Sequence, residues 1–113
     1  MGDKSEPAEL ESAELGPGGG KIIFENERVR VWDIELDPGQ RSNLHRHTLD
    51  YMLIQLEGDR IAAEPHPETK GKYDQYEEVD VHPGDFLFID KGGTETAVNV
   101  GKKRWREICI ELK

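Results

Sequence analysis

The two residues whose type and spacing most clearly suggest chemistry are His45 and His47, which are separated by one residue. Side chains at positions i and i+2 of a β-strand point to the same face of the sheet. If the segment is a strand, the two imidazoles could therefore bind one metal ion together. The spacing alone also fits two unrelated histidines in a solvated loop. The residues around the pair are therefore needed to choose between these two interpretations.

The segment around these histidines resembles the first motif of the cupin superfamily, G-x5-H-x-H-x3/4-E-x6-G. Gly39, His45, His47 and Gly58 fall at the family spacing. Tyr51 stands where the family has a metal-binding glutamate, so this position departs from the pattern. The resemblance implies that His45 and His47 are metal ligands on a strand that faces the inside of a β-barrel.

A second segment resembles the second cupin motif, G-x5-P-x-G-x2-H-x3-N. Gly84, Gly92 and Asn99 match it, whereas Asp90 replaces the proline and Glu95 replaces the histidine. The similarity extends from about Phe24 to Lys113. It includes the opening Glu25–Trp32 and the closing Arg106–Lys113 segments, which look like those of small, single-domain, RmlC-like bacterial cupins.

The ligand set that the resemblance implies is His45, His47 and Glu95. Two imidazoles and one carboxylate form the facial triad of non-haem Fe(II) oxygenases. Mn, Ni and Zn also accept this set, so the ligands do not identify which of the four metals is bound. Tyr51 is a poor ligand near neutral pH because its phenol titrates near 10, so we expect it to assist proton transfer to a substrate. In the competing interpretation no metal is bound, and Glu95 acts as a base within a hydrogen-bonded cluster with the histidines.

The elements that must position these residues are β-strands. Segments rich in β-branched and aromatic residues alternate with turns such as Asp37-Pro38-Gly39, and no helical period persists. The pattern predicts about eight strands, with a hairpin turn over residues 101–103 before the last of them. The expected strands cover residues 22–24, 28–36, 51–56, 60–63, 77–81, 86–89, 96–100 and 104–112.

This pattern favours an all-β protein, an antiparallel sandwich or barrel. The resemblance specifies a cupin double-stranded β-helix, which is a jelly-roll β-barrel. Residues 1–20 hold five acidic residues and end in a glycine-rich run, so we expect a flexible N-terminal tail. Residues 21–113 are expected to form one cupin barrel domain.

Composition limits the partners. The 113 residues include 24 acids against 15 bases, a formal net charge of -9. This balance argues against nucleic acid or an anionic membrane as the main partner. No apolar run approaches the roughly 20 residues of a membrane span, the N-terminus lacks the apolar core of a signal peptide, and one cysteine excludes a disulfide framework. A cytoplasmic protein with a small-molecule ligand in its barrel is expected, and the resemblance suggests a homodimer.

Three further residues are candidate substrate contacts. Gln55 shares strand parity with Tyr51, so it could point into the barrel. Arg41 could pair with a substrate carboxylate. Phe86 and Phe88 alternate onto one face and are expected in the barrel core, where Phe88 could contact substrate. Trp32, Trp105 and Cys109 are expected to be buried core residues.

Two functions remain open at this stage. One is a metal-dependent enzyme that acts on a small polar metabolite as an oxygenase, isomerase or lyase. The other is a non-enzymatic or metal-free small-molecule-binding cupin with a degenerate metal site. Fold alone does not separate them.

Overall fold

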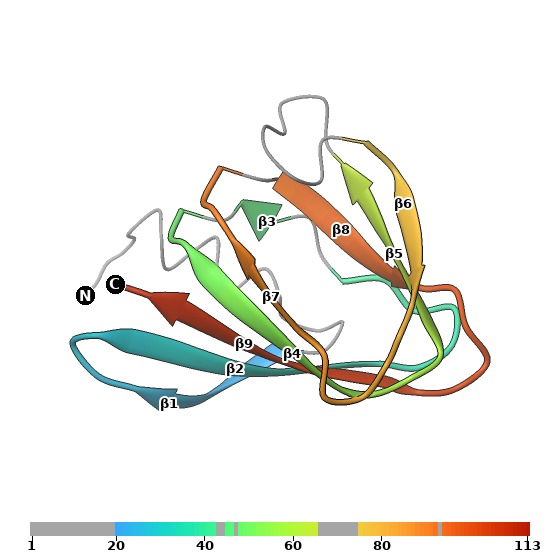
Figure 1. Cartoon of the computed structure of the whole chain (residues 1–113), viewed down its shortest axis with the longest axis horizontal. Coiled ribbons are helices and arrows are strands. Elements are labelled where there is room, and N and C mark those ends of the chain that lie inside the picture. Colours follow the sequence, from blue (N-terminus) through green and yellow to red (C-terminus); the bar gives the residue numbers. More distant parts are fainter. Residues whose placement is uncertain (1–19, 43–44, 47, 66–74, 93) are drawn as a thin grey trace.

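The computed structural model describes residues 20–42, 45–46, 48–65, 75–92 and 94–113, and for residues 45, 46, 94 and 95 it describes the backbone only. The predicted tail over residues 1–20 therefore lies, except for Gly20, outside the described residues. The strands that these ranges contain are shown in Figure 1. They are β1 (Gly20–Glu25), β2 (Val29–Leu36), β3 (His45–Arg46), β4 (Tyr51–Glu57), β5 (Arg60–Pro65), β6 (Glu77–Asp80), β7 (Phe86–Ile89), β8 (Thr94–Asn99) and β9 (Trp105–Leu112).

The strands form two antiparallel sheets that make the two layers of the molecule (Figure 1). Sheet A has the order β1-β2-β9-β4-β7, and sheet B has the order β3-β8-β5-β6. The all-β prediction is confirmed, and each of the eight predicted strands has a counterpart. The short strand β3 was missing from the predicted strands. No helix in the described ranges is long and apolar enough to cross a membrane.

The connection between β8 and β9 differs from the prediction. Residues 101–103 do not join two paired strands of a hairpin, because β8 lies in sheet B and β9 in sheet A. The turn is held by side chains from elsewhere. The Asp59 carboxylate accepts hydrogen bonds from the backbone N–H of Lys102, at 3.0 and 3.1 Å, and these bonds lower the pKa of Asp59. A short turn of this kind can therefore connect strands of two different sheets, although its sequence resembles that of a hairpin turn.

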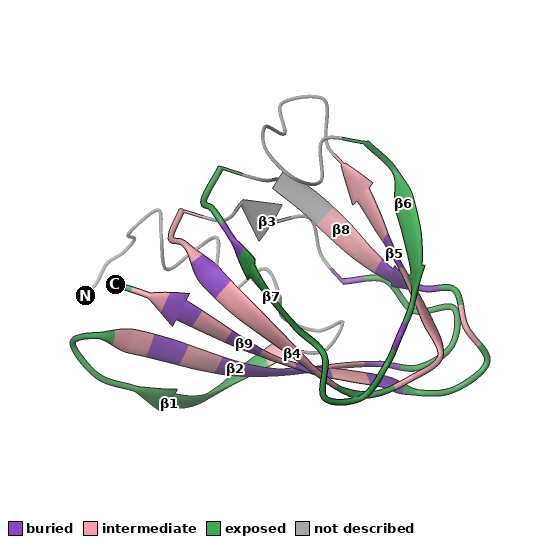
Figure 2. Ribbon diagram, viewed as in Figure 1, coloured by how far each residue is buried: buried purple, intermediate pink, exposed green. Residues whose placement is uncertain are grey.

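Alternation along the strands places the core between the two sheets. In β9 every second residue is buried, starting at Trp105, and the intervening residues are partly exposed (Figure 2). β2 contributes Trp32, Ile34 and Leu36 to the same core. The prediction that Trp32, Trp105 and Cys109 are buried is confirmed. The period-2 pattern of a sheet with one buried face explains this arrangement.

The prediction that Phe86 and Phe88 lie in the barrel core is wrong. Phe88 pairs with Met52 in β4, whereas its neighbour Ile89 pairs with Tyr51, which is buried. By this register Phe86 and Phe88 belong to the outer face of sheet A and are 64% and 53% exposed, and Phe86, at the start of β7, also borders the cavity described below. Strand β7 reads Phe-Leu-Phe-Ile, so no polar residue marks its outer face, and only the register with β4 decides it.

A buried ion pair joins the central strand of sheet A, β9, to its neighbour β2. Arg30 Nε in β2 donates to Glu111 Oε1 in β9 at 2.8 Å, and Trp32 Nε1 donates to the same oxygen at 2.8 Å. Arg30 and Glu111 are both buried. A buried carboxylate requires such partners, because an unpaired charge in the interior is costly.

Removing this carboxylate should destabilise the fold. We expect Glu111→Ala to lower the free energy of unfolding by about 3–5 kcal/mol, because it removes the buried partner of Arg30 and leaves the more distant, exposed Glu25 carboxylate. Urea unfolding followed by tryptophan fluorescence measures the change. The matched control is Glu25→Ala, whose exposed carboxylate lies 3.7 Å from the Arg30 guanidinium and should contribute about 1 kcal/mol or less. Equal losses in the two variants would contradict this assignment.

Candidate functional site

The backbone brings two of the three predicted metal ligands into register. His45 in β3 is the direct cross-strand partner of Glu95 in β8. Directly opposed residues of an antiparallel pair are near neighbours on the same face of a sheet. The side chains of His45 and Glu95 are not described, and His47 lies outside the described residues. The ligand set therefore stays a prediction, with a register that is compatible with it.

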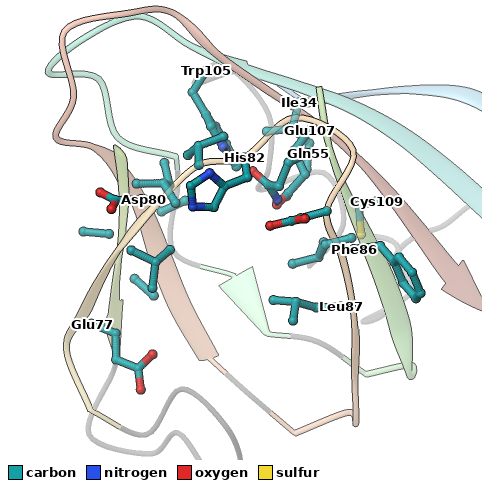
Figure 3. Close-up of a pocket in the computed structure, with 18 of the residues that line it drawn as sticks. Ile34, Gln55, Glu77, Asp80, His82, Phe86, Leu87, Trp105, Glu107 and Cys109 are labelled. Atoms are coloured by element: carbon teal, nitrogen blue, oxygen red, sulfur yellow. Dashed lines mark hydrogen bonds between the residues drawn. The ribbon is translucent and has the colours of Figure 1, made fainter. Parts of the chain in front are cut away.

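A cavity of about 390 Å³ lies between the two sheets. Its wall includes residues from β2, β4, β7 and β9 of sheet A and from β5, β6 and β8 of sheet B (Figure 3). Apolar side chains form much of this wall: Ile34, Leu53, Ile61, Val79, Val81, Leu87 and Ala97. The polar residues that line it are Ser42, Tyr51, Gln55, Glu77, Asp80, His82, Asp85 and Glu107. A volume of this size, with a few polar groups, is typical of a small-molecule site.

Three adjacent side chains form a hydrogen-bonded chain at one end of this cavity. Trp105 Nε1 donates to Gln55 Oε1 at 2.8 Å, and Gln55 Nε2 donates to Glu107 Oε2 at 2.5 Å. Gln55 and Glu107 are direct cross-strand partners in β4 and β9, and Figure 3 shows their side chains beside each other. An indole N–H can only donate, so it fixes which end of the Gln55 amide faces Glu107. Gln55 is among the residues that line the cavity, and its contact with a substrate stays a prediction.

Tyr51 also lines the cavity and is buried. It begins β4, four residues before Gln55, and pairs with Glu111 on one side and Ile89 on the other. Its backbone therefore belongs to the rigid centre of sheet A. This position is consistent with a role beside a bound ligand, and the proton-transfer role stays a prediction.

Two predicted substrate contacts lie away from the cavity. The Arg41 side chain is 55% exposed and forms an ion pair with Glu64. Phe88 lies on the outer face of sheet A, as described above. Neither is among the cavity-lining residues that the structure describes. Alternation along a strand could not predict the direction of the Arg41 side chain. Arg41 lies outside strands β1 to β9, and its described pairing is an isolated bridge to Val98.

A second ionic cluster lies on β5 and β6, at the cavity wall. Arg60 Nη1 contacts Asp80 Oδ1 at 2.5 Å, and Arg60 Nε donates to Glu78 Oε1 at 3.0 Å. The hydrogen bonds to Glu78 and to Asp80 raise the pKa of Arg60, so the guanidinium stays charged. The Asp80 carboxylate, which lines the cavity, therefore has its charge matched by a cation on the same sheet.

The glycines and the asparagine that match the two cupin motifs have structural roles. Gly39, Gly58, Gly84 and Gly92 all have positive φ. At Gly58 a Cβ atom would also lie 2.9 Å from Trp105 Cδ1, so a side chain here would disturb the tryptophan that holds Gln55. Glycine at position 58 thus leaves room for the Trp105 ring, which holds Gln55 at the cavity wall.

Asn99, the last residue of the second motif, fixes the turn between the sheets. Its Nδ2 donates to the Leu36 and Lys103 carbonyls, each at 2.9 Å, and its Oδ1 accepts from the Gly101 N–H at 2.9 Å. Asn99 is 1% exposed. A buried amide with three such bonds has a structural role, because it satisfies backbone groups that the turn leaves unpaired.

Sequence reasoning missed Glu107, the buried carboxylate of the cavity. The signal was present in the last strand, where Trp105, Glu107, Cys109 and Glu111 occupy alternate positions. Burial of the tryptophan and the cysteine implies burial of the two glutamates on the same face. Among the residues whose side chains are described, no three histidine, cysteine, aspartate or glutamate residues gather into a metal-binding group.

Loss of the indole donor should loosen this hydrogen-bonded chain. We expect Trp105→Phe to lower the free energy of unfolding by about 1–3 kcal/mol, since Gln55 Oε1 loses its donor inside the protein. Tyr76→Phe is the matched control, because it removes an exposed hydroxyl that donates to Glu78. This control should change the stability by less than about 0.5 kcal/mol in urea unfolding. Indistinguishable effects of the two substitutions would refute a structural role for the Trp105–Gln55 bond.

Comparison with solved structures identifies the fold. A cupin domain from Bordetella pertussis superposes with a TM-score of 0.72 and 22% sequence identity, over 86% of this chain and 95% of that chain. An RmlC-like cupin family protein with a double-stranded β-helix fold from Methanocaldococcus jannaschii gives a TM-score of 0.65 at 12% identity, over 82% and 77% of the two chains. A cupin superfamily protein from Desulfitobacterium hafniense gives 0.61 at 18% identity, over 99% and 93%.

Sequence comparison adds no further relative: no protein-family model and no curated protein matches the chain. The fold assignment therefore depends on the structural likeness together with the sheet order and the glycine positions described above. The two sheets, the cavity between them and these neighbours agree: this chain has the cupin fold, a double-stranded β-helix.

Proposed function

We propose that this chain is a metal-dependent cupin enzyme that acts on a small polar metabolite in the cavity between its sheets. The observation that supports this proposal best is the pairing of His45 with Glu95. Ala97, two residues after Glu95 in β8, lines the cavity. Because alternate residues of a strand share one face, the position of Ala97 supports the proposal that the ligands face the cavity.

The donor chemistry fits a divalent ion. His45, His47 and Glu95 would supply two imidazole nitrogens and one carboxylate, a set that Fe, Mn, Ni and Zn accept. When bound, such an ion supplies Lewis-acid or oxygen-activating chemistry to a ligand. Tyr51, at the start of β4, would hold or move a proton at its phenol oxygen.

Metal content tests this proposal. We expect protein purified without added metal, then incubated with Fe(II), Mn(II), Ni(II) or Zn(II) and dialysed, to retain about one ion per chain of at least one of these metals. Elemental analysis provides the measurement. Both His45→Ala and Glu95→Gln should reduce retention by about tenfold or more, because ligand loss weakens a three-ligand site strongly.

The control for this experiment is His82→Ala, which removes a histidine of the cavity wall that is outside the proposed ligand set. It should retain metal as the unaltered chain does. A stoichiometry near zero for all four ions in the unaltered chain would overturn the metal proposal.

A non-enzymatic or metal-free small-molecule-binding cupin is the second candidate. It is favoured by Tyr51, a buried residue at the position where the family has a metal-binding glutamate. The chain of Trp105, Gln55 and Glu107 could also position a ligand without an ion. Turnover separates the two functions: a bound metabolite that is consumed, with consumption lost in His45→Ala or Glu95→Gln, excludes the pure binder.

We also propose that two copies of the chain pair through the outer face of sheet A. One row of apolar residues crosses all five strands in register, and a shorter row follows it. The first row is Phe24, Val31, Ile110, Met52 and Phe88, and the second is Ile108, Ile54 and Phe86. An exposed apolar face of this extent is unusual on a monomer.

The size and rim of this face fit a second copy. The strands of sheet A hold 6, 8, 8, 7 and 4 residues. At about 4.8 Å spacing and about 3.4 Å rise, their face covers about 540 Å², which is near the lower end of the range per partner for specific interfaces. Charged residues border the apolar rows, with the Arg106 guanidinium 3.0 Å from the Asp33 carboxylate. An apolar centre with a polar rim is the usual anatomy of such an interface.

A single charge introduced on the outer face of sheet A should separate the two copies of the dimer. We expect the unaltered chain to be a dimer and Phe88→Arg to be a monomer in sedimentation equilibrium, since burying an unpaired charge costs several kcal/mol. Tyr76→Arg is the control, because Tyr76 is equally exposed but precedes β6 of sheet B. A monomeric unaltered chain at about 50 μM, well above the Kd of a stable dimer, would contradict the pairing.

A further inference from the structure

We propose that the cavity binds an uncharged small molecule with an apolar body, which fills the open side of the barrel between strands β6 and β7. This inference rests on the proposed function in one respect, since it takes the cavity between the sheets as the ligand site. It goes further in naming the class of ligand: a fused ring or a short branched chain whose polar group carries no charge. The open side of the cavity, the apolar residues exposed there and the hydrogen bonds of its buried wall each support it.

The cavity opens to solvent between two edge strands. β7 is the outermost strand of sheet A, and β6 is the outermost strand of sheet B. The lining residues of β6 and β7 are all exposed, whereas those of β2, β4, β5, β8 and β9 are all buried or half-buried (Figure 2). A small molecule can therefore enter between β6 and β7, because these two strands belong to different sheets and are not paired.

Two apolar residues on this open side are exposed although they belong to inner faces. Leu87 of β7 pairs with Leu53, and Val79 of β6 pairs with Ile61. Both partners line the cavity, and directly opposed residues share one face of a sheet. Leu87 and Val79 are nevertheless 40% and 46% exposed. Inward side chains of two facing sheets normally pack against each other, so an apolar body between these two would remove both from water.

The polar groups of the buried wall already bond to the protein. Gln55 accepts from the Trp105 indole and donates to Glu107. The Ser42 hydroxyl oxygen accepts from a backbone N–H of β8 at 2.9 Å. Tyr51 is not without a partner, and Glu107 has an interaction besides its bond to Gln55. A wall whose polar groups are engaged in this way recognises a ligand mainly by its apolar surface.

The charges around the cavity do not select a charged ligand. Three of the lining carboxylates, those of Glu77, Asp80 and Asp85, are exposed, and Asp80 is paired with Arg60. Water and salt screen exposed charges of this kind. No lysine or arginine is among the described lining residues, so the described wall offers an anion no cationic partner. Because burying an unpaired charge is costly, we expect the bound molecule to be neutral.

The volume of the cavity limits the size of the ligand. An apolar cavity of about 150 Å³ accommodates one benzene ring. The cavity of about 390 Å³ therefore has room for two fused rings and one small polar group. This volume lies near the lower end of the range for small-molecule sites.

Four probes of similar size test the charge and the polarity of the ligand. They are 2-naphthylmethanol, 2-naphthylmethylamine, 2-naphthoate and glucose, titrated at pH 7 into the full chain as purified, by isothermal calorimetry or by NMR chemical shifts. We expect the naphthyl alcohol to bind about tenfold more tightly than either naphthyl ion, because each ion loses hydration on burial. Glucose, which is neutral but polar over its whole surface, should bind at least about tenfold more weakly than the alcohol. Equal or tighter binding of an ion or of glucose would overturn the inference without any variant.

The variants Leu87→Asn and Val79→Asn test the two edge strands. Both residues are exposed, so the chain should stay folded, and urea unfolding checks this. Each variant should weaken binding of the naphthyl alcohol about fivefold, because a polar amide replaces an apolar contact. Leu56→Asn makes the same change at a β4 residue that is 36% exposed and outside the described lining, and should alter the affinity by less than about twofold. Unchanged affinity in either folded cavity variant would refute the contact with that strand.

Nuclear Overhauser effects locate the bound molecule. Effects from 2-naphthylmethanol to the methyl groups of Leu53, Leu87 and Val79 should place it between β6 and β7. Effects to Ile54 and Ile110 instead would place it on the outer apolar face of sheet A, and this result would overturn the inference.

Metal content measured on the same protein keeps the two proposals apart. Selective binding of the naphthyl alcohol by a chain that retains no metal would support this ligand class and overturn the metal-dependent function. Metal retention without that selectivity would support the proposed function and overturn the ligand class.

Discussion

The constraint on which the structure depends is the burial of two carboxylates on the inner face of β9. Strand β9 lies between β2 and β4, and Glu107 and Glu111 on its inner face are each 6% exposed, so both need partners from the neighbouring strands. Glu111 accepts from Arg30 and Trp32, both of β2. Glu107 accepts from Gln55 of β4. Residues of β2, β4 and β9 therefore depend on one another, because the buried carboxylates of β9 need hydrogen-bond donors from both neighbouring strands.

The two carboxylates differ in what surrounds them. Glu111 is paired with a buried arginine, so its charge is matched within the protein. Glu107 instead lines the cavity between the sheets, and one of its hydrogen bonds is accepted from the neutral Gln55 amide. One strand thereby supplies both an internal ion pair and a buried carboxylate at the cavity wall.

Much of the fold could be predicted from the sequence, because period-2 alternation and turn residues such as Pro38-Gly39 act locally. The register between strands could not. Phe86 and Phe88 appeared to be core residues because both faces of β7 are apolar, and the turn at 101–103 resembled a hairpin because nothing local reveals that its two strands enter different sheets. Of the candidate site, Gln55 followed from its parity with Tyr51. Glu107 was missed because a glutamate in a strand is ordinarily read as an outward residue.

The most direct test of the proposed metal site is X-ray absorption spectroscopy at the metal edge of the chain loaded with Zn(II) or Fe(II). We expect a first shell of nitrogen and oxygen only, at about 2.0–2.1 Å for zinc, with the outer-shell scattering of two imidazoles. That scattering should fall to one imidazole in His45→Ala. A sulfur scatterer near about 2.3 Å, or a shell without imidazole, would contradict the ligand set of His45, His47 and Glu95.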